Sequence, residues 1–591
     1  MDDPDGPVPI VGSSTYKKWI AKALKKGYIK NVELAKEIPS FEKGLDIWNN
    51  PHKAALSDMY RKQCARCHIW EEGRRERGDF RAGGCSACHV LYTNDGYYEG
   101  NDPTIRQDEP GHMMKHEITI KIPATQCTHC HTRGKRIGTT FVGAFEYDYK
   151  TDNLAVPFNE KGEHQELLFT KDYIKVREDA HFEKGMECVD CHTSIDVHGD
   201  GNIYPSTLYQ VEIQCADCHG TPEKYPWELP VGYGTPVTLE GERGIYKDEL
   251  GIEYLLTSRG NARANLKKQG KEVILTSFFS GKDHEVPLLK EKKLMGNWKT
   301  KQGEVSMATI NQHLDKLECY ACHSTWAPQC FGCHIKYDRR KIGTDWITTA
   351  LRHDPYSGKQ TITKTPGDIY ENRGFMRWEE PILGINIKGK VTPVIPGCQV
   401  VFTYVDENGK VDVVNKIFKT SDGFSAITMA PVTPHAVTIP ARTCEDCHTN
   451  PKAIGYGTAV SRSQAKLDKE EEPMFMNNAE GYYGDIPGSK RAKWQVPKIL
   501  EFPYAWDQLL TRSGKQVQNM PHQEDRPLNK KERDLMEREG LCIACHQYYG
   551  EKEWENIIKT YGKADTPEKH DEIMEKAMKA LFEKAKGGTK R

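Results

Sequence analysis

The chain has 591 residues, of which 37% are hydrophobic, and its 83 Lys and Arg residues nearly balance its 84 Asp and Glu residues, so that the formal net charge is -1. A charge this small provides no electrostatic attraction to nucleic acid. The mean hydropathy is -0.70, and no apolar run approaches the roughly 18 residues that a membrane-spanning helix needs. Composition therefore argues against a basic nucleic-acid-binding protein and against a membrane span.

Residues 1–50 are expected to form an N-terminal helical segment. Within them, the run TYKKWIAKALKKGYIKNVELAKEI spaces its apolar residues as an amphipathic helix does and carries a lysine-rich face. Those lysines either face solvent or dock to an acidic partner. The first residues, MDDPDGPVPIVGSS, lack the basic start and apolar stretch of an export signal.

Residues 51–227 introduce a motif in which two cysteines stand three positions apart and a histidine follows at once. Five copies lie in this region, two more in residues 311–340 and two in residues 441–591. Numbered 1 to 9 in chain order, they are Cys64/Cys67/His68, Cys85/Cys88/His89, Cys127/Cys130/His131, Cys188/Cys191/His192, Cys215/Cys218/His219, Cys319/Cys322/His323, Cys330/Cys333/His334, Cys444/Cys447/His448 and Cys542/Cys545/His546. Only Cys398 is left over, and we expect it to be a buried, unreactive thiol or, alternatively, to pair with a second chain.

This motif is the attachment sequence of c-type haem. Its spacing lets the two thiols form thioethers to one edge of a haem while the imidazole of the next residue binds the iron. Zinc sites and disulfide frameworks also use paired cysteines, but neither explains a histidine after every second cysteine. We therefore expect nine covalently bound haem c groups, whose propionates make the assembled protein acidic and argue further against a nucleic-acid partner.

Two segments without motifs contain strand-like runs separated by glycines and charged turns. Residues 228–310 form an expected β-containing insertion with the runs YGTPVTL, GIEYLL and KEVILTSFF, and residues 341–440 form a linker and a β-rich insertion in which DENGK makes a hairpin turn. Helical periodicity returns after motif 9. The expected fold is a multihaem cytochrome that is mainly α and irregular, with a haem-packed core, β insertions and a helical C-terminal region.

Thirteen histidines lie outside the last position of the motifs and are candidates for the second axial ligand of an iron. Most of those that we expect to bind iron lie a short loop away from a motif. They are His52, His112, His116, His181, His198, His313, His435 and His522. His129 and His353 stay open, whereas His164, His284 and His570 are expected in solvent. Thirteen candidates for nine haems permit every iron to have two histidine ligands.

Segments around the motifs, such as HEITIKIPATQCTHCHTRGKRIG, HFEKGMECVDCHTSIDVHGDG and LECYACHSTWAPQCFGCH, resemble the large multihaem cytochromes of respiratory bacteria. That grouping includes octahaem tetrathionate reductases, hydroxylamine oxidoreductases, pentahaem nitrite reductases and nine-haem surface cytochromes of metal reducers. The resemblance implies haems in close parallel and perpendicular pairs and long helices near the C-terminus. Two departures are that no motif here ends in Lys, as at the catalytic haem of pentahaem nitrite reductases, and that no spacing identifies a tyrosine linked to a porphyrin.

These patterns predict an electron-transfer protein with closely packed, mostly bis-histidine haems. Its expected partners are redox proteins or an extracellular electron acceptor, and a homo-oligomer is also compatible. The alternative is a reductase of nitrite, hydroxylamine or tetrathionate with one open-coordination haem, for which no catalytic residue is identified; a further alternative is a subunit of a cytochrome filament. Because haem c is attached outside the cytoplasm, we expect a periplasmic or extracellular location and regard the chain as the mature product.

Overall fold

The computed structural model describes several stretches of the chain and a few isolated positions. The stretches are residues 83–93, 97–108, 112–132, 135–147, 172–331, 333–351, 362–372, 375–416, 427–457, 507–520 and 524–546. The isolated positions are Val8, Pro9, Lys25, Arg61, Lys62, Ala65, Tyr504, His522, Lys569, Glu572, Glu575, Lys576 and Lys579. The expected N-terminal helix therefore lies outside the described residues except for Lys25, which is helical.

The strands of the described residues form a seven-stranded sheet, a five-stranded sheet and three two-stranded sheets. Their bounds are β1 Val8–Pro9, β2 Ala144–Tyr147, β3 Asp172–Lys175, β4 Asn202–Ile203, β5 Ile245–Lys247, β6 Glu253–Leu256, β7 Ala262–Gln269, β8 Glu272–Thr276, β9 Asp283–Glu285, β10 Ala327–Phe331, β11 Cys333–Thr344, β12 Lys364–Asn372, β13 Phe375–Glu379, β14 Ile382–Ile385, β15 Val391–Val405, β16 Val411–Lys416, β17 Ile427–Pro431 and β18 Arg526–Pro527.

Most helices of the described residues are a single turn long. Their bounds are α4 Ser86–His89, α5 Ala124–Thr128, α6 Ile137–Phe141, α7 Ala180–Glu183, α8 Cys188–Cys191, α9 Ser194–His198, α10 Thr207–Gln210, α11 Cys215–His219, α12 Leu289–Met295, α13 Lys301–Glu304, α14 Asn311–Lys316, α15 Cys319–His323, α16 Trp346–Leu351, α17 Glu445–His448, α18 Pro451–Ile454 and α21 Lys530–His546, with a 3-10 turn at Pro226–Glu228 and a π-helical turn at Val305–Thr309. None is long and apolar enough to cross a membrane.

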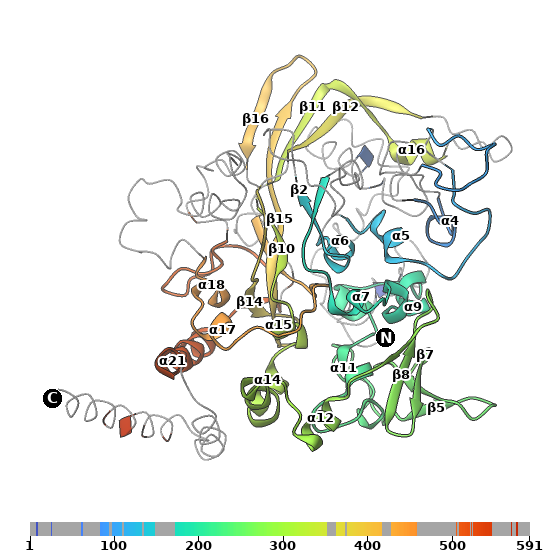
Figure 1. Ribbon diagram of the computed structural model, residues 1–591. Coiled ribbons are helices and arrows are strands. Elements are labelled where there is room, and N and C mark those ends of the chain that lie inside the picture. Colours follow the sequence, from blue (N-terminus) through green and yellow to red (C-terminus); the bar gives the residue numbers. More distant parts are fainter. Residues whose placement is uncertain are drawn as a thin grey trace, which may run out of the picture.

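The seven-stranded sheet is organised around β15. Its strand order is β12-β11-β15-β14-β18, and β16 and β17 also pair with β15. The β11–β15 pairing is parallel, from Cys333 opposite Val400 to Asp338 opposite Val405, and the others are antiparallel. β15 is rich in Val, Ile, Thr, Phe and Tyr, which suit a pleated, half-buried surface. Figure 1 shows β11, β12, β15 and β16 extending to the top of the view.

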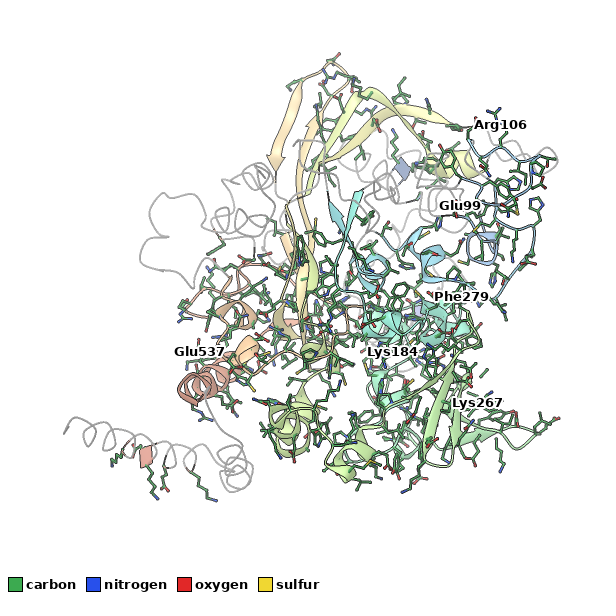
Figure 2. All side chains as sticks on the ribbon, in the orientation of Figure 1. Glu99, Arg106, Lys184, Lys267, Phe279 and Glu537 are labelled. Atoms are coloured by element: carbon green, nitrogen blue, oxygen red, sulfur yellow. The ribbon has the colours of Figure 1, made fainter. Side chains whose placement is uncertain are left out.

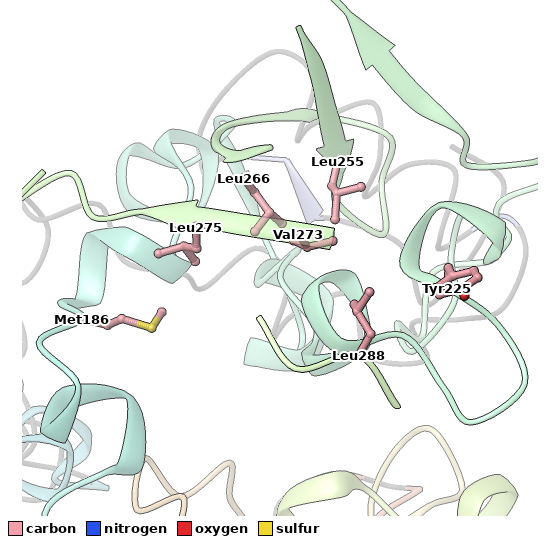
Figure 3. Close-up of a cluster of buried hydrophobic side chains, with 7 residues drawn as sticks. All are labelled: Met186, Tyr225, Leu255, Leu266, Val273, Leu275 and Leu288. Atoms are coloured by element: carbon pink, nitrogen blue, oxygen red, sulfur yellow. The ribbon is translucent and has the colours of Figure 1, made fainter. Parts of the chain in front are cut away.

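The five-stranded sheet runs in chain order from β5 to β9, and every pairing is antiparallel. A two-residue turn at Gly270 joins β7 to β8, and Gly270 has a φ of +63° that suits the tight turn of a hairpin. One face of the sheet buries the cluster drawn in Figure 3. It comprises Met186, Tyr225, Leu255, Leu266, Val273, Leu275 and Leu288. Cys191 of motif 4 and Cys218 of motif 5 pack against this cluster, so the sheet supports two motifs directly.

The expectation of a mainly α and irregular fold is wrong. The described chain is 29% helix and 24% strand, with several antiparallel sheets. The strands also form part of the hydrophobic core. β14 and β15 supply fully buried side chains such as Ile382 and Val394, which pack with Met429 of β17 and Leu509. Sequence patterns missed this because the sheet joins segments far apart in the chain, and such pairings leave no local signal.

Individual strand predictions had mixed outcomes. The runs GIEYLL and KEVILTSFF contain β6 and β8, and the DENGK run turns between β15 and β16, where Asp406 N–H donates to the Lys410 carbonyl at 2.9 Å. YGTPVTL, by contrast, contains no strand. After motif 9, the predicted C-terminal helix lies outside the described residues apart from five isolated helical positions.

Candidate haem-binding sites

Six motifs have described side chains at both cysteines and the histidine, and each lies on or next to a helix of four or five residues. These are motif 2 on α4, motif 3 on α5, motif 4 on α8, motif 5 on α11, motif 6 on α15 and motif 8 on α17. The histidine N–H donates to the carbonyl of the first cysteine, for example from His192 to Cys188 at 2.9 Å and from His448 to Cys444 at 2.8 Å. One helical turn therefore brings the first cysteine and the histidine to the same side.

The backbone of the second cysteine in motifs 2 and 3 is hydrogen-bonded to the first cysteine of its motif. Cys88 N–H donates to the Cys85 carbonyl at 3.3 Å, and Cys130 N–H donates to the Cys127 carbonyl at 3.1 Å. Cys88 lies within α4, whereas Cys130 lies in the turn that follows α5. Both residues are half-buried, and both take part in further interactions within the chain. Haem attachment at Cys88 and Cys130, as at the other motifs, stays a prediction.

Motif 7 departs from the helical pattern of the other six. Cys330 lies in β10, opposite Met376 of β13, and Cys333 and His334 are the first residues of β11. Successive side chains of a strand point to opposite faces of the sheet, so a helical turn does not gather this motif. The sequence pattern, which is the same in all nine motifs, gave no sign of this difference.

Three motifs carry an aspartate directly before the second cysteine, and this residue caps the motif helix. Asp190 accepts from Glu187 N–H at 2.8 Å, Asp217 from Gln214 N–H at 2.9 Å and Asp446 from Thr443 N–H at 2.7 Å. In each case the donor lies three residues earlier, so the side chain satisfies a backbone group at the start of the turn. Sequence reasoning missed these residues, although the pattern Cys-x-Asp-Cys-His was readable.

The five-stranded sheet anchors two of these aspartates. Asp190 also accepts from Phe278 N–H at 2.6 Å. Asp217 forms a buried ion pair with Arg243 and accepts from Ser258 N–H at 3.2 Å. Because both carboxyl groups are buried and hydrogen-bonded, motifs 4 and 5 are attached to the sheet by polar contacts as well as by apolar packing.

Four motif histidines each face a second histidine that lies far away in the chain. The ring centroids are 6.1 Å apart for His89 and His198, 6.1 Å for His192 and His435, 6.2 Å for His219 and His181, and 6.2 Å for His448 and His313. The first two pairs are nearly parallel, with 14° between the ring planes. All four partners belong to the set predicted as second axial ligands.

This spacing fits an iron ion between the two rings. Two metal–nitrogen bonds of about 2 Å, with ~1 Å from each nitrogen to its ring centre, place the centroids of two opposed imidazoles ~6 Å apart. The rings of His112 and His116, which are tilted by 32° to each other, lie closer, with 5.0 Å between their centroids. The four pairs are therefore spaced as opposed axial ligands.

The Nδ1 atoms of seven of these eight rings have partners, which leaves the Nε2 atom of each for a metal. His89 Nδ1 donates to the Thr119 carbonyl at 2.8 Å, His219 Nδ1 to Pro287 at 2.9 Å and His435 Nδ1 to Thr433 at 3.0 Å. Two rings use carboxylates instead: His181 contacts Asp179 at 2.8 Å and His192 contacts Asp196 at 3.3 Å. The remaining contacts are those of His198 with the Ser194 hydroxyl and of His448 with the Met536 carbonyl at 3.3 Å and the Glu539 carboxylate at 3.5 Å.

Burial keeps several of these imidazoles in the neutral form that binds a metal. It lowers the pKa of His435 to about 4, and the nearby His192 lowers it further. Burial also lowers the pKa of His219 to about 4. The pKa of His313 is lowered by burial and by His448. Neutral imidazole is the form with a free lone pair, so ligation at these positions costs no deprotonation at neutral pH.

Apolar side chains flank the pair formed by His89 and His198. Ile118 and Ile120, on either side of the Thr119 carbonyl that His89 contacts, are 80% and 72% exposed, and Val197, next to His198, is 53% exposed. Large apolar side chains gathered on a surface mark a site for an apolar ligand. Together with two thiols and two imidazoles, this is the donor set and the surface that a covalently bound haem needs.

Neighbouring motifs lie against one another through their cysteines. The thiols of Cys127 and Cys188 shift each other's pKa, which places motifs 3 and 4 side by side, and those of Cys215 and Cys319 do the same for motifs 5 and 6. Burial raises the pKa of the Cys191 thiol to about 12, and Cys218 raises it further, so motifs 4 and 5 are adjacent.

The row continues from motif 6 to motif 8. Burial raises the pKa of Cys322 to about 12, with a further contribution from Cys447, and Ala321 of motif 6 packs in one cluster with Cys447. Motifs 3, 4, 5, 6 and 8 thus form one continuous series. In the view of Figure 2, α15 and α17 of this series lie between Lys184, which follows α7, and Glu537 on α21.

The other predicted ligands have different outcomes. His52 and motif 1, with Cys64, Cys67 and His68, lie outside the described residues, as do the side chains of Cys333, His334, Cys542, Cys545 and His546. The rings of His112 and His116 contact each other, and burial lowers the pKa of His522. Within the described part of the chain, no histidine ring faces His131 or His323.

Two further histidines, His129 and His284, lie among the described residues. His129, between the cysteines of motif 3, is buried, and His284 is half-buried rather than solvent-exposed as expected. Among the described residues, no three His, Cys, Asp or Glu side chains converge as in a zinc site, whereas axial ligation of haem iron takes only two side chains.

No family model, curated protein or solved structure matches this chain.

Proposed function

We propose that this chain is a nine-haem c-type cytochrome that transfers electrons, with bis-histidine ligation at motifs 2, 4, 5 and 8. The observation that carries the proposal is the set of four histidine pairs with ring centroids 6.1 to 6.2 Å apart. Each pair joins a motif histidine to one from a distant segment, and stacking alone does not require this separation.

The continuous series of motifs supports electron transfer over a purely structural role for the cofactors. Haem c supplies an iron that changes between ferrous and ferric states. The residues of the chain bring neighbouring attachment sites into contact at Cys127 and Cys188 and at Cys215 and Cys319. The His pairs close both sides of the iron position, which excludes a substrate there. A periplasmic or extracellular location remains part of the proposal because haem c is attached outside the cytoplasm.

A second candidate is a multihaem reductase of small oxyanions or nitrogen compounds. It is favoured by motifs 3 and 6, where no histidine of the described residues faces His131 or His323. A reductase needs an iron with one open side, where substrate binds and charged groups stabilise the reacting anion.

Counting high-spin ferric haems by electron paramagnetic resonance of the purified holoprotein separates the two candidates. The electron-transfer proposal expects only low-spin signals and slow reduction of nitrite and hydroxylamine. At least one high-spin haem per chain, together with tight nitrite binding and fast turnover, would establish the reductase instead.

A further inference from the structure

Asp179 is a buried carboxyl group that holds parts of two of the candidate haem sites. It is 2% exposed and lies at the N-terminal cap of α7. Its Oδ1 accepts both the backbone N–H and the ring Nδ1–H of His181, each at 2.8 Å. Its Oδ2 accepts the N–H of Val437 at 2.7 Å. The carboxyl group is therefore fully engaged, with a histidine ring on one oxygen.

These contacts connect motifs 4 and 5. His181 faces His219 of motif 5, and Val437 lies two residues after His435, which faces His192 of motif 4. A further hydrogen bond from Ala180 N–H to the Val437 carbonyl, at 2.8 Å, fixes α7 to the segment that carries His435. One aspartate thus positions the distal histidines of both sites.

The acceptor at Nδ1 differs between the four sites. A carboxylate draws the Nδ1 proton more strongly than a carbonyl does, which makes Nε2 a better electron donor and favours the more positive oxidation state of a bound iron. Thr119, Pro287 and Thr433 offer only backbone carbonyls. His448 Nδ1 lies 3.3 Å from the Met536 carbonyl and 3.5 Å from the Glu539 carboxylate, which is longer than the contact of Asp179 with His181. Asp196 is a carboxylate, but its 3.3 Å contact with His192 is longer than the 2.8 Å of Asp179 with His181.

We infer that Asp179 is a positioning residue that lowers the reduction potential of the iron between His219 and His181 below those of the other three histidine-paired sites. The inference rests on the proposed function and adds the order of potentials along the series of motifs. Among the histidine-paired motifs 4, 5 and 8 of the series, electrons then have their highest energy at motif 5, so that motifs 4 and 8 on either side of it hold electrons more favourably.

The test is a redox titration of holoprotein carrying Asp179→Asn, followed by visible absorption and by the low-spin g values. Asparagine keeps the size and the capping oxygen but removes the charge, so we expect the lowest potential to rise and one low-spin g set to move. Asp338→Asn is the matched control, because Asp338 is buried and pairs with Arg340 rather than with a histidine; all potentials should stay unchanged. Asp196→Asn should give a smaller shift at a different haem.

Unchanged potentials in Asp179→Asn, with all haems low-spin, would overturn the inference while leaving the proposed function intact. The absence of a new high-spin haem in His181→Ala would instead contradict the proposed function itself. If Asp179→Asn does not accumulate, Asp179→Ser is the second variant, because the serine hydroxyl can cap the helix but its side chain is too short to reach the His181 ring. The same rise in the lowest potential is expected. An unchanged lowest potential in this variant would contradict the inference equally.

Discussion

At the scale of single residues, the candidate ligands differ in what holds their rings. His435 contacts its own segment through the Thr433 carbonyl, whereas His181 and Val437 share Asp179. The chemical type of the Nδ1 partner varies from site to site, and it is a main route by which a protein tunes identical ligands. Identical motifs can therefore carry irons of different potential.

Replacement of His435 tests the pairing at this scale. His435→Ala should leave the haem of motif 4 attached through Cys188 and Cys191 but open one side of its iron, because His435 faces His192 at 6.1 Å. We expect one new high-spin signal in the electron paramagnetic resonance spectrum. His284→Ala is the matched control and should leave the spectrum unchanged. An unaltered spectrum in His435→Ala would exclude His435 as a ligand.

The ion pair of Asp338 with Arg340 predicts a pH dependence of stability. The two hydrogen bonds from Arg340, at 2.9 and 2.7 Å, hold the pKa of Asp338 below its ordinary range. A lowered folded-state pKa means that the ionised carboxylate stabilises the fold above about pH 4 and that this contribution is lost as the pH falls through the lowered value.

Asp338→Asn should therefore lower the free energy of unfolding by about 1–2 kcal/mol at neutral pH. The difference from the unmodified protein should shrink in acid, and denaturant titrations at several pH values measure it. A difference that stays constant as the pH falls from about 4 through the lowered pKa of Asp338 would show that the charge of Asp338 does not contribute.

At the scale of elements, the motif helices depend on their surroundings. A helix of four or five residues is unstable alone, because its nucleation cost exceeds what one turn returns. Capping by Asp190 and Asp217, and packing of Cys191 and Cys218 on the five-stranded sheet, supply what α8 and α11 lack. The sheet therefore stabilises the helices of motifs 4 and 5.

Two leucines of this sheet region give a matched test. Leu266 on β7 is 0% exposed, whereas Leu250 in the β5–β6 turn is 85% exposed. Leu266→Ala should destabilise the protein by about 3 kcal/mol through lost burial and a residual cavity, and Leu250→Ala by less than about 0.5 kcal/mol. Denaturant unfolding measures both. Equal effects would mean that the cluster around Leu266 is not the core of the sheet.

At the scale of the whole molecule, the number of cofactors is the primary expectation. Nine complete motifs predict that the intact mass exceeds that of the polypeptide by nine haems. The colour should also remain with the protein after acid–acetone extraction, since thioether bonds survive it. A mass for eight or fewer haems would show that a motif is unused, and peptide mapping would then identify that motif.

The sequence by itself determined what is local in this protein. The two cysteines and the histidine of a motif lie within five consecutive positions, so their spacing predicts haem attachment and the proximal ligand without knowledge of the fold. The strands at 253–256 and 272–276 and the turn after Val405 were also readable, because branched and aromatic residues alternate there and a turn sequence follows.

Only the tertiary structure decided which distant residues meet. Asp179 and Val437 lie 258 positions apart, and neither the partner of His192 nor the neighbour of Cys215 leaves any trace in local pattern. The balance of helix and strand was misjudged for the same reason, since β15 pairs with β11, β14, β16 and β17. Hydrophobic periodicity records which face of an element is buried, but it does not record what buries it.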